Sequence, residues 1–423
     1  MLLTAGCLQT EDTHETNPTG RTIHGIRFSP EQLKEIRSLS PLPPLPRVPQ
    51  NQYADNEQAA VLGRRLFFET RLSSNNEVSC ATCHDPKQDF TDGKPLSEGL
   101  ETVTRNSPTL FNQAYNRWFF WDGRKDSLWA QSLGPIENAK EMGGSRVQTY
   151  HLIANDPLLR QEYEAVFGKL TPLETSAPPK TGYPVPGTPE DEQHLAWSRL
   201  SEADQKNINR TFANIGKSIA AYERQLISSN APFDQFVAAL DSKASSAEAM
   251  LPASAVRGLK IFIEKGQCTF CHSGPNFTDL EFHNIGLDRG ENGLDTGRFE
   301  AIKKVKRDPF NGLGSYSDER SIEQNKSLFY LAQKPNNLGE FKTPTLRNVA
   351  NTAPYMHDGR FASLREVIRF YSLLNQTPAL GHREETLQPL DLSESEIEDL
   401  AAFLSSLTGA PLQMSLLEAP TDH

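Results

Sequence analysis

The sequence predicts a mainly α-helical protein with extended loops, built from two related halves. Two similar segments, AAVLGRRLFFE at 59–69 and SAVRGLKIFIE at 254–264, each have the apolar spacing of a short amphipathic helix. Each of them precedes a C-x-x-C-H motif. Two S-x-x-E sequences before later apolar runs are helix-start signals of the capping-box type. We find no series of alternating polar and apolar residues that would predict a large sheet, so an internally duplicated helical fold is expected.

The first 50 residues are predicted to contain a signal remnant and a proline-rich tether. The start, MLLTAGCLQ, is similar to the end of a bacterial lipoprotein signal with Cys7 as the lipidated residue, although the basic region and most of the apolar region of such a signal are missing. A stray cysteine in an unstructured tail is the alternative. The following polar residues and the stretch PLPPLPRVP are typical of an extended linker.

The rest of the chain is predicted to form an N-terminal domain over 51–245 and a C-terminal domain over 246–423. Three positions of the two duplicated helices correspond: Gly63 with Gly258, Leu66 with Ile261, and Phe67 with Phe262. The join is expected near SKASSAEAMLPAS at 242–254. Two capping boxes predict further helices in the second domain, Ser363 with Glu366 and Ser393 with Glu396.

The composition limits the classes of partner. The 423 residues include 43 basic and 54 acidic side chains, which gives a net charge of −11 without a basic run. This argues against nucleic acid and anionic membrane surfaces as partners, and it suits a basic protein partner. No apolar stretch approaches the roughly 20 residues of a membrane span. A lipid on Cys7 is therefore the membrane attachment that the sequence suggests.

Four of the five cysteines lie in the two C-x-x-C-H motifs, CATCH and CTFCH. This motif attaches c-type haem, since both thiols bond to the porphyrin and the adjacent histidine ligates the iron. A redox pair would not need the histidine, and zinc would need two pairs closer together. We therefore predict two covalent haems, held by Cys80, Cys83 and His84 and by Cys268, Cys271 and His272. Because haem c is attached outside the cytoplasm, a periplasmic or cell-envelope location is expected.

The distribution of the ten histidines bears on the first haem. None lies between His84 and His151, so the neighbourhood of the first motif offers no histidine as a sixth ligand. An electron carrier closes both sides of its iron, whereas a haem that binds peroxide needs an open side. The pattern therefore favours a haem that binds peroxide.

Over roughly residues 55–410 the chain resembles the bacterial di-haem cytochrome c peroxidases and their relative MauG, the di-haem enzyme of methylamine utilisation. The blocks that support this occur in order: GRRLFFETRLSSNNEVSCATCH, RNSPTLFNQAYN, FFWDGRKDSLWAQSLGPIENAKEMG, FKTPTLRNV and APYMHDGRFASLREVI. The resemblance implies two cytochrome c-like haem domains in a peroxidase-type oxidoreductase that acts on hydrogen peroxide.

Two departures imply the MauG-like branch of this family. The peroxidases have a histidine in the loop after the first motif, and the loop DPKQDFTDGKPLSEGLETVTRNSP has none. They also have a methionine ligand of the second haem fourteen residues after the histidine of the HDG block, where this chain has Tyr371. The resemblance thus implies a five-coordinate first haem and His272/Tyr371 ligation of the second, with a phenolate that favours high-valent iron. A packing role for Tyr371, or Met356 as the ligand, remains an alternative.

The resemblance also implies residues of a peroxide pocket. Glu141 matches the distal glutamate, a group that can move a proton from one peroxide oxygen to the other. Gln131 and Pro135 match its neighbours in the pocket wall. Glu137 is the alternative proton carrier.

Further matches lie between the two haems. Trp121 corresponds to the tryptophan between the haems of the family, and a large core aromatic is its alternative role. The positions that hold a calcium ion correspond to Asn106, Thr352 and Pro354, whose oxygen atoms are suitable ligands. His357 matches a histidine near the haem interface to which we assign no role.

Together these features predict a MauG-like enzyme that activates hydrogen peroxide and oxidises a partner protein through high-valent iron. A cytochrome c peroxidase that removes peroxide is the first alternative, with a protein electron donor as its partner. A di-haem electron carrier is the second alternative. MauG has a tryptophan two residues before its second motif, where this chain has Gly266. The sequence therefore does not assign the route by which oxidising equivalents leave the protein. It also does not rank the other tryptophans, Trp118, Trp129 and Trp197.

Overall fold

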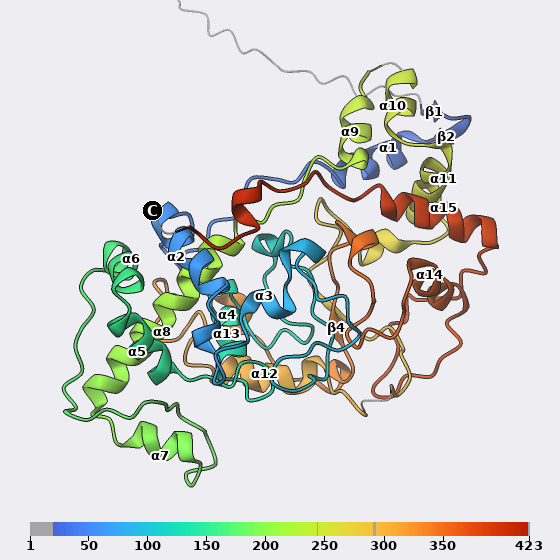
Figure 1. Cartoon of the computed structure of the whole chain (residues 1–423). Coiled ribbons are helices and arrows are strands. Elements are labelled where there is room, and N and C mark those ends of the chain that lie inside the picture. The colour runs from blue at the N-terminus through green and yellow to red at the C-terminus, as the bar shows by residue number, and fades with distance from the viewer. Residues whose placement is uncertain (1–19, 243, 291–292, 422–423) are drawn as a thin grey trace, which may run out of the picture.

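The computed structural model describes residues 20–242, 244–290 and 293–421, and in these residues the chain is mainly helical (Figure 1). Cys7 lies outside the described residues. The strands are two short antiparallel pairs, β1 (Arg21–Ile23) with β2 (Ile26–Phe28) and β3 (Phe282–His283) with β4 (Phe341–Lys342). Within the described ranges, no helix has the length and apolar character needed to cross a bilayer. The predicted mainly α class is confirmed.

The N-terminal half is organised around one long helix. Its helices are α2 (Glu57–Phe67), α3 (Cys80–Cys83), α4 (Leu128–Glu137), α5 (Arg146–Asn155), α6 (Pro157–Phe167), α7 (Glu192–Ser198) and α8 (Glu202–Glu223). Helices α2 and α4 both pack against α8. The core between them is rich in aromatic residues, among which Phe67, Trp129 and Tyr222 are buried.

The C-terminal half contains the second copy of the helix-and-motif unit. Its helices are α9 (Pro232–Ala239), α10 (Ala244–Met250), α11 (Ala253–Ile263), α12 (Arg298–Arg307), α13 (Lys326–Phe329), α14 (Leu364–Leu373) and α15 (Glu394–Ser405). Helix α11 packs against α15. The capping boxes predicted at Ser363 and Ser393 are present at the starts of α14 and α15.

The duplicated helices α2 and α11 use the same glycine for close packing. A Cβ on Gly63 would lie 1.8 Å from the carbonyl oxygen of Ser218 on α8. A Cβ on Gly258 would lie 1.9 Å from the carbonyl oxygen of Asp399 on α15. Because both distances are far below van der Waals contact, only glycine lets each backbone approach its partner helix. The internal duplication therefore extends from the sequence pattern to the packing of the helices.

Both ends of the described chain cross to the other half of the molecule. The β1–β2 hairpin and α1 (Pro30–Ser38) pack on the core of the C-terminal half through Ile23, Phe28 and Ile36. The C-terminal segment 410–421 runs back to the N-terminal half, as the red trace in Figure 1 shows, where Leu416 packs on that core.

The tether expected over residues 1–50 is therefore corrected for residues 21–38. Their apolar side chains are spaced for a hairpin and a helix, and Ser29 and Gln32 form a capping box that begins α1. The prediction gave weight to the prolines that follow. These few apolar residues are buried only against a core whose other residues lie more than 190 positions further along the chain, so no local pattern indicates their burial.

Candidate functional site

The first C-x-x-C-H motif forms the one-turn helix α3 and its C-cap. Ser79 and Thr82 make reciprocal capping bonds at the start, and His84 follows the last turn. The Nδ1 atom of His84 lies 3.1 Å from the carbonyl oxygen of Phe90. A carbonyl can only accept, so Nδ1 donates and the Nε2 lone pair is left for a metal. Burial lowers the pKa of His84, which keeps the ring neutral as a ligand must be.

The second motif repeats this arrangement. Cys268–Phe270 form a short 3-10 turn, and the Nδ1 atom of His272 lies 3.0 Å from the carbonyl oxygen of Phe277. Burial also lowers the pKa of His272. Both histidines are therefore oriented by a backbone carbonyl five or six residues later in the chain.

The four motif cysteines are free thiols, so neither pair forms a disulfide. Burial raises the pKa of Cys83 and of Cys268 to about 12. A reactive or metal-binding cysteine needs the opposite, a lowered pKa that favours the thiolate. In each motif, two unbridged, partly buried cysteines lie next to an oriented neutral histidine, which fits the covalent attachment of haem.

A cavity of about 340 Å³ adjoins the first motif, and Cys83 and His84 form part of its wall. The predicted residues Gln131, Pro135 and Glu141 line the same cavity. Gln131 and Pro135 are four residues apart on α4 and so face the same way. The Oε1 atom of Gln131 is buried without a hydrogen-bond partner. A polar ligand in this cavity would satisfy it.

Glu141 has the properties of a proton carrier. Burial raises the pKa of its carboxyl group, while the Arg124 cation and a hydrogen bond from Asn138 Nδ2 to Oε1, at 2.7 Å, lower it. The net effect is a raised pKa, so the carboxyl group is a weaker acid than usual and its conjugate base a better proton acceptor. The alternative, Glu137, does not line the cavity and forms a two-bond ion pair with Arg146.

Trp121 lies where the two halves meet. Its side chain lines the first cavity, and its Nε1 donates a 2.9 Å hydrogen bond to the carbonyl oxygen of Asn106. Its own carbonyl oxygen accepts a 2.8 Å bond from the backbone N–H of Lys342 on β4, in the C-terminal half. Trp121 is thus held by backbone contacts from both sides.

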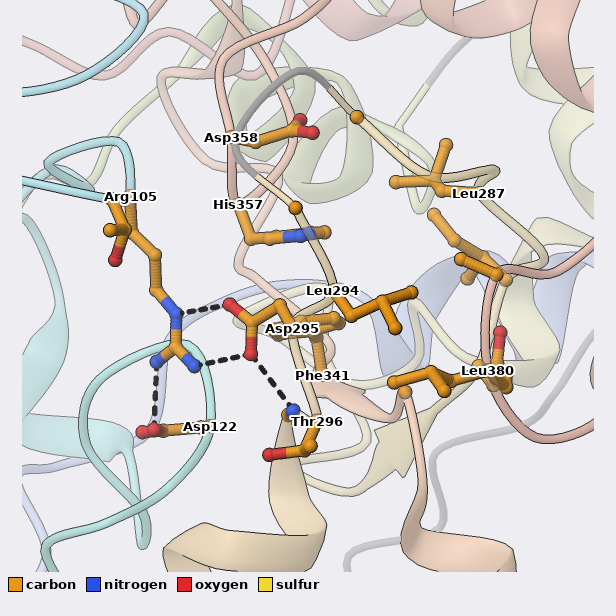
Figure 2. A pocket seen from close by; sticks show the side chains of 18 of the residues that line it. Arg105, Asp122, Leu287, Leu294, Asp295, Thr296, Phe341, His357, Asp358 and Leu380 are labelled. Atoms are coloured by element: carbon orange, nitrogen blue, oxygen red, sulfur yellow. Dashed lines mark hydrogen bonds and ion pairs between the residues drawn. The ribbon is translucent and has the colours of Figure 1, made fainter.

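A second cavity, of about 280 Å³, lies between the halves (Figure 2). The Arg105 guanidinium spans its floor, with Nη1 2.7 Å from Asp122 and Nη2 2.8 Å from Asp295. The His357 ring stacks on Phe341 with 3.7 Å between centroids, and burial lowers the pKa of His357 to about 4. The two cavities share four wall residues: Thr104, Arg105, Asp122 and Lys304.

Tyr371 on α14 lies beside the second motif. Burial raises the pKa of its hydroxyl group, and the sulfur atoms of Cys271 and Cys268 add to the effect. The hydroxyl makes no hydrogen bond to any residue that the structure describes. Met356 packs in the same apolar cluster as Tyr371, and Ile285 of that cluster also lines the second cavity. The structure therefore brings Tyr371 to the second motif and places Met356 in the same apolar cluster.

The three residues predicted to hold calcium also come from both halves. The backbone N–H of Asn106 donates to the carbonyl oxygen of His357 at 2.8 Å, and its side-chain Nδ2 donates to the carbonyl oxygen of Lys94 at 2.8 Å. This leaves Oδ1 of Asn106 for a ligand. Thr352 and Pro354 lie a few residues before His357, and the Oγ1 atom of Thr352 donates to Val349 at 3.3 Å. The calcium site stays a prediction.

The position of Gly266 disfavours a large side chain. A Cβ there would lie 2.9 Å from the carbonyl oxygen of Ile261 and 3.0 Å from the sulfur of Cys268. Trp118 is buried under the Arg298 guanidinium, 4.3 Å from the ring centroid, and this cation opposes oxidation of the indole. Trp129 and Trp197 are buried in the N-terminal core.

Sequence reasoning missed the cations around the cavities, namely Arg105, Arg124 and Lys304. Arg124 lies three residues after Trp121, so the block FFWDGRKDS contained a signal for it. Lys304 could not be found in this way, because α12 reaches the cavities only in the folded molecule.

Comparison with known proteins identifies the family. The model of the di-haem cytochrome c peroxidase family matches residues 57–242. The cytochrome-c peroxidase IdrP2 of Denitromonas iodatirespirans is 32% identical over 85% of this chain and 84% of its own. The methylamine utilization protein MauG of Methylorubrum extorquens is 30% identical over 86% of this chain and 82% of its own.

A solved structure supports the same relationship. A MauG-like protein associated with microbial copper homeostasis superposes with a TM-score of 0.59 at 26% identity, over 90% of this chain and 97% of that one. The likeness thus covers both halves and both haem motifs. The chain belongs to the di-haem cytochrome c peroxidase family, whose members are haem-dependent oxidoreductases with two haem c groups.

Proposed function

We propose that the protein activates hydrogen peroxide at a five-coordinate first haem and oxidises a partner protein, in the manner of MauG. The observation that supports this most is the shared cavity of His84, Gln131 and Glu141, which joins an iron ligand to a proton carrier. When bound, the two haems supply cleavage of the O–O bond and storage of oxidising equivalents as high-valent iron.

The residues around the first cavity are proposed to have separate roles in the reaction with peroxide. His84, held by the Phe90 carbonyl, would ligate the iron of the first haem in the cavity that it lines. A carboxylate oxygen of Glu141 accepts the proton of one peroxide oxygen and returns it to the other, which then leaves as water. The unpartnered Oε1 of Gln131 accepts a hydrogen bond from the peroxide O–H and orients it.

The residues around the second motif are proposed to stabilise the oxidised state. His272 and Tyr371 would both ligate the iron of the second haem. A buried phenol ionises only where a cation compensates its charge, so ferric iron would have to lower the pKa that burial raises. Trp121 lies at the junction of the halves and would carry electrons between the two sites.

We further propose a calcium ion that joins the halves through Asn106, Thr352 and Pro354, completed by water. The proposed location is the periplasm or cell envelope, because haem c is attached there. The partner is a protein substrate or a protein electron donor.

A cytochrome c peroxidase that removes peroxide is the second candidate, and the surroundings of Gly266 favour it. MauG has tryptophan at this position, but here a Cβ would already lie 2.9 Å from the Ile261 carbonyl oxygen and 3.0 Å from the Cys268 sulfur, so a larger side chain would require these atoms to shift. Without a tryptophan at this position, electrons would have to enter the protein at another point of its surface. A small electron-donor protein could dock at such a point.

The test is electron paramagnetic resonance of the ferric holoprotein before and after one equivalent of peroxide. We expect one high-spin centre, the first haem, and one low-spin centre, with loss of both signals after peroxide. Two low-spin signals in the resting protein would exclude an open first iron and favour an electron carrier. Loss of the high-spin signal alone would favour the simpler peroxidase.

A further inference from the structure

Arg124 is a cation in the wall of the first cavity for which the proposed mechanism has no task. Its guanidinium carbon lies 3.5 Å above the centre of the Phe120 ring, which fixes the plane of the group. Its side chain makes one hydrogen bond to a described residue, from Nη1 to Asp122 Oδ1 at 3.1 Å. None of the residues that the structure describes accepts from the remaining N–H donors, and the side chain lines the same cavity as His84.

The position of Arg124 is held firmly. Asp122 is buried, and although burial alone would raise the pKa of its carboxyl group, the cations of Arg124 and Arg105 lower it to about 2. Asp122 is therefore a permanent anion that anchors Arg124 on one edge. The backbone N–H of Arg124 also donates to Asp122 Oδ1, at 3.2 Å, so the same carboxylate fixes both the turn and the side chain.

Arg124 also acts on Glu141 across the cavity, since its charge is the largest effect that opposes burial and lowers the pKa of that carboxyl group. Three other cations line the cavity. Arg105 is held between Asp122 and Asp295, at 2.7 and 2.8 Å, and the two lysines are held less firmly. Lys140 is half exposed and pairs loosely with Glu101 at 3.6 Å, and Lys304 is exposed. The Nε, Nη1 and Nη2 atoms of Arg105 all contact Asp295 or Asp122, so Arg124 is the ordered cation of this wall that keeps donors without a described acceptor.

We propose that Arg124 is an anion-binding residue of the peroxide site. It holds the hydroperoxide anion that remains when Glu141 has taken the proton of hydrogen peroxide. In this step an O–H bond breaks, its electron pair stays on oxygen, the proton moves to a Glu141 carboxylate oxygen, and nothing is oxidised. A guanidinium suits the task because it stays charged and offers parallel N–H donors to a small anion. The inference rests on the proposed function of the first haem.

The experiment measures ligand affinity at the first iron of the ferric holoprotein by absorbance. Fluoride tests the binding of an anion, and imidazole, a neutral ligand, tests the integrity of the cavity. We expect Arg124→Gln to weaken fluoride at least tenfold and to change imidazole less than twofold. Arg124→Lys keeps the charge and should recover part of the fluoride affinity. The matched control is Arg160→Gln, which removes an exposed arginine that pairs with Glu164 on α6.

The outcomes separate this inference from the proposed function. If the parent protein binds neither ligand at the first iron, the proposed open haem is wrong and the inference fails with it. If the parent binds both and Arg124→Gln leaves fluoride unchanged, the inference alone is wrong. A parallel loss of fluoride and imidazole would show a general defect of the cavity and also overturn it. An altered redox potential with unchanged fluoride affinity would assign Arg124 to a haem carboxylate instead.

Discussion

Glu141 and Tyr371 are two acids that burial makes weaker, and their surroundings lead them to different states. Glu141 has Arg124 and Asn138 beside it, so its carboxyl group can exchange a proton. Tyr371 has apolar side chains and the second motif around it, and its phenol stays neutral unless a metal binds. The proposed chemistry follows from these two environments.

Replacing Glu141 with glutamine tests the proton carrier. Glutamine keeps the shape and the hydrogen bond with Asn138 but cannot exchange a proton. We expect a loss of about 10²-fold or more in the peroxide reaction, the usual range for a general acid–base group, measured by stopped-flow absorbance. Glu137→Gln is the control, since Glu137 pairs with Arg146 outside the cavity. The assignment is wrong if the control loses the reaction and Glu141→Gln keeps it.

The pH dependence of the same reaction follows from the pKa of Glu141. Only the carboxylate accepts a proton, and burial raises its pKa above the ordinary 4.5. The rate constant should therefore fall as the pH drops through this raised pKa, at a higher pH than an ordinary carboxylate would show. A profile measured from pH 4 to pH 9 checks this. The acid limb should disappear in Glu141→Gln, and its persistence there would point to another group.

Replacing Tyr371 with methionine tests the ligand of the second haem. A hard anionic phenolate favours the ferric state, whereas a thioether favours the ferrous state and raises the potential. We expect the potential of the second haem to rise in a redox titration and any long-lived two-haem oxidised state to vanish. Met356→Leu is the matched control. If only Met356→Leu changes the potential, the thioether is the ligand and Tyr371 has a packing role.

The helices show which parts of the fold can be predicted from sequence. Helices α2, α11, α14 and α15 carry their signals locally, as an apolar period or a capping box. Helix α1 was missed because its apolar residues gain burial only from a core formed by distant residues. The candidate site divides in the same way. The haem motifs are local, but the wall that Arg105 and Lys304 contribute exists only after α12 and the interface are in place.

The glycines of α2 and α11 give a prediction about how these helices pack. Gly63→Ala and Gly258→Ala each place a methyl group against a backbone oxygen of a packed helix. Overpacking of this kind costs about 1–3 kcal/mol in the free energy of unfolding. Thermal unfolding followed at the haem absorbance should show the loss in both variants. Ser254→Ala, on the partly exposed face of α11, is the control. Equal stability of all three would mean that α8 and α15 move away at little cost.

The whole molecule is joined by its crossed chain ends. In the N-terminal half, Tyr222 donates a 2.6 Å hydrogen bond to the carbonyl oxygen of Leu416, and Arg64 donates to that of Ser415. Deletion of residues 410–423 removes these contacts and the leucines that cover the first core. We expect the first haem domain to unfold at a lower temperature, although the deleted residues belong to the other half in sequence. Circular dichroism and haem absorbance would measure this, and an unchanged transition at the first haem would contradict it.

The crossed ends also determine when the protein can be completed during its synthesis. The hairpin and α1 are made before the rest of the described chain, but the surface on which they pack is finished only with α15. The core of the N-terminal half in turn gains apolar residues from 410–421, which are synthesised after nearly all of the described chain. Domains often fold one after another from the N-terminus, and this chain cannot do so fully. A prematurely terminated chain therefore leaves both halves incomplete, and neither haem motif then lies in a finished core.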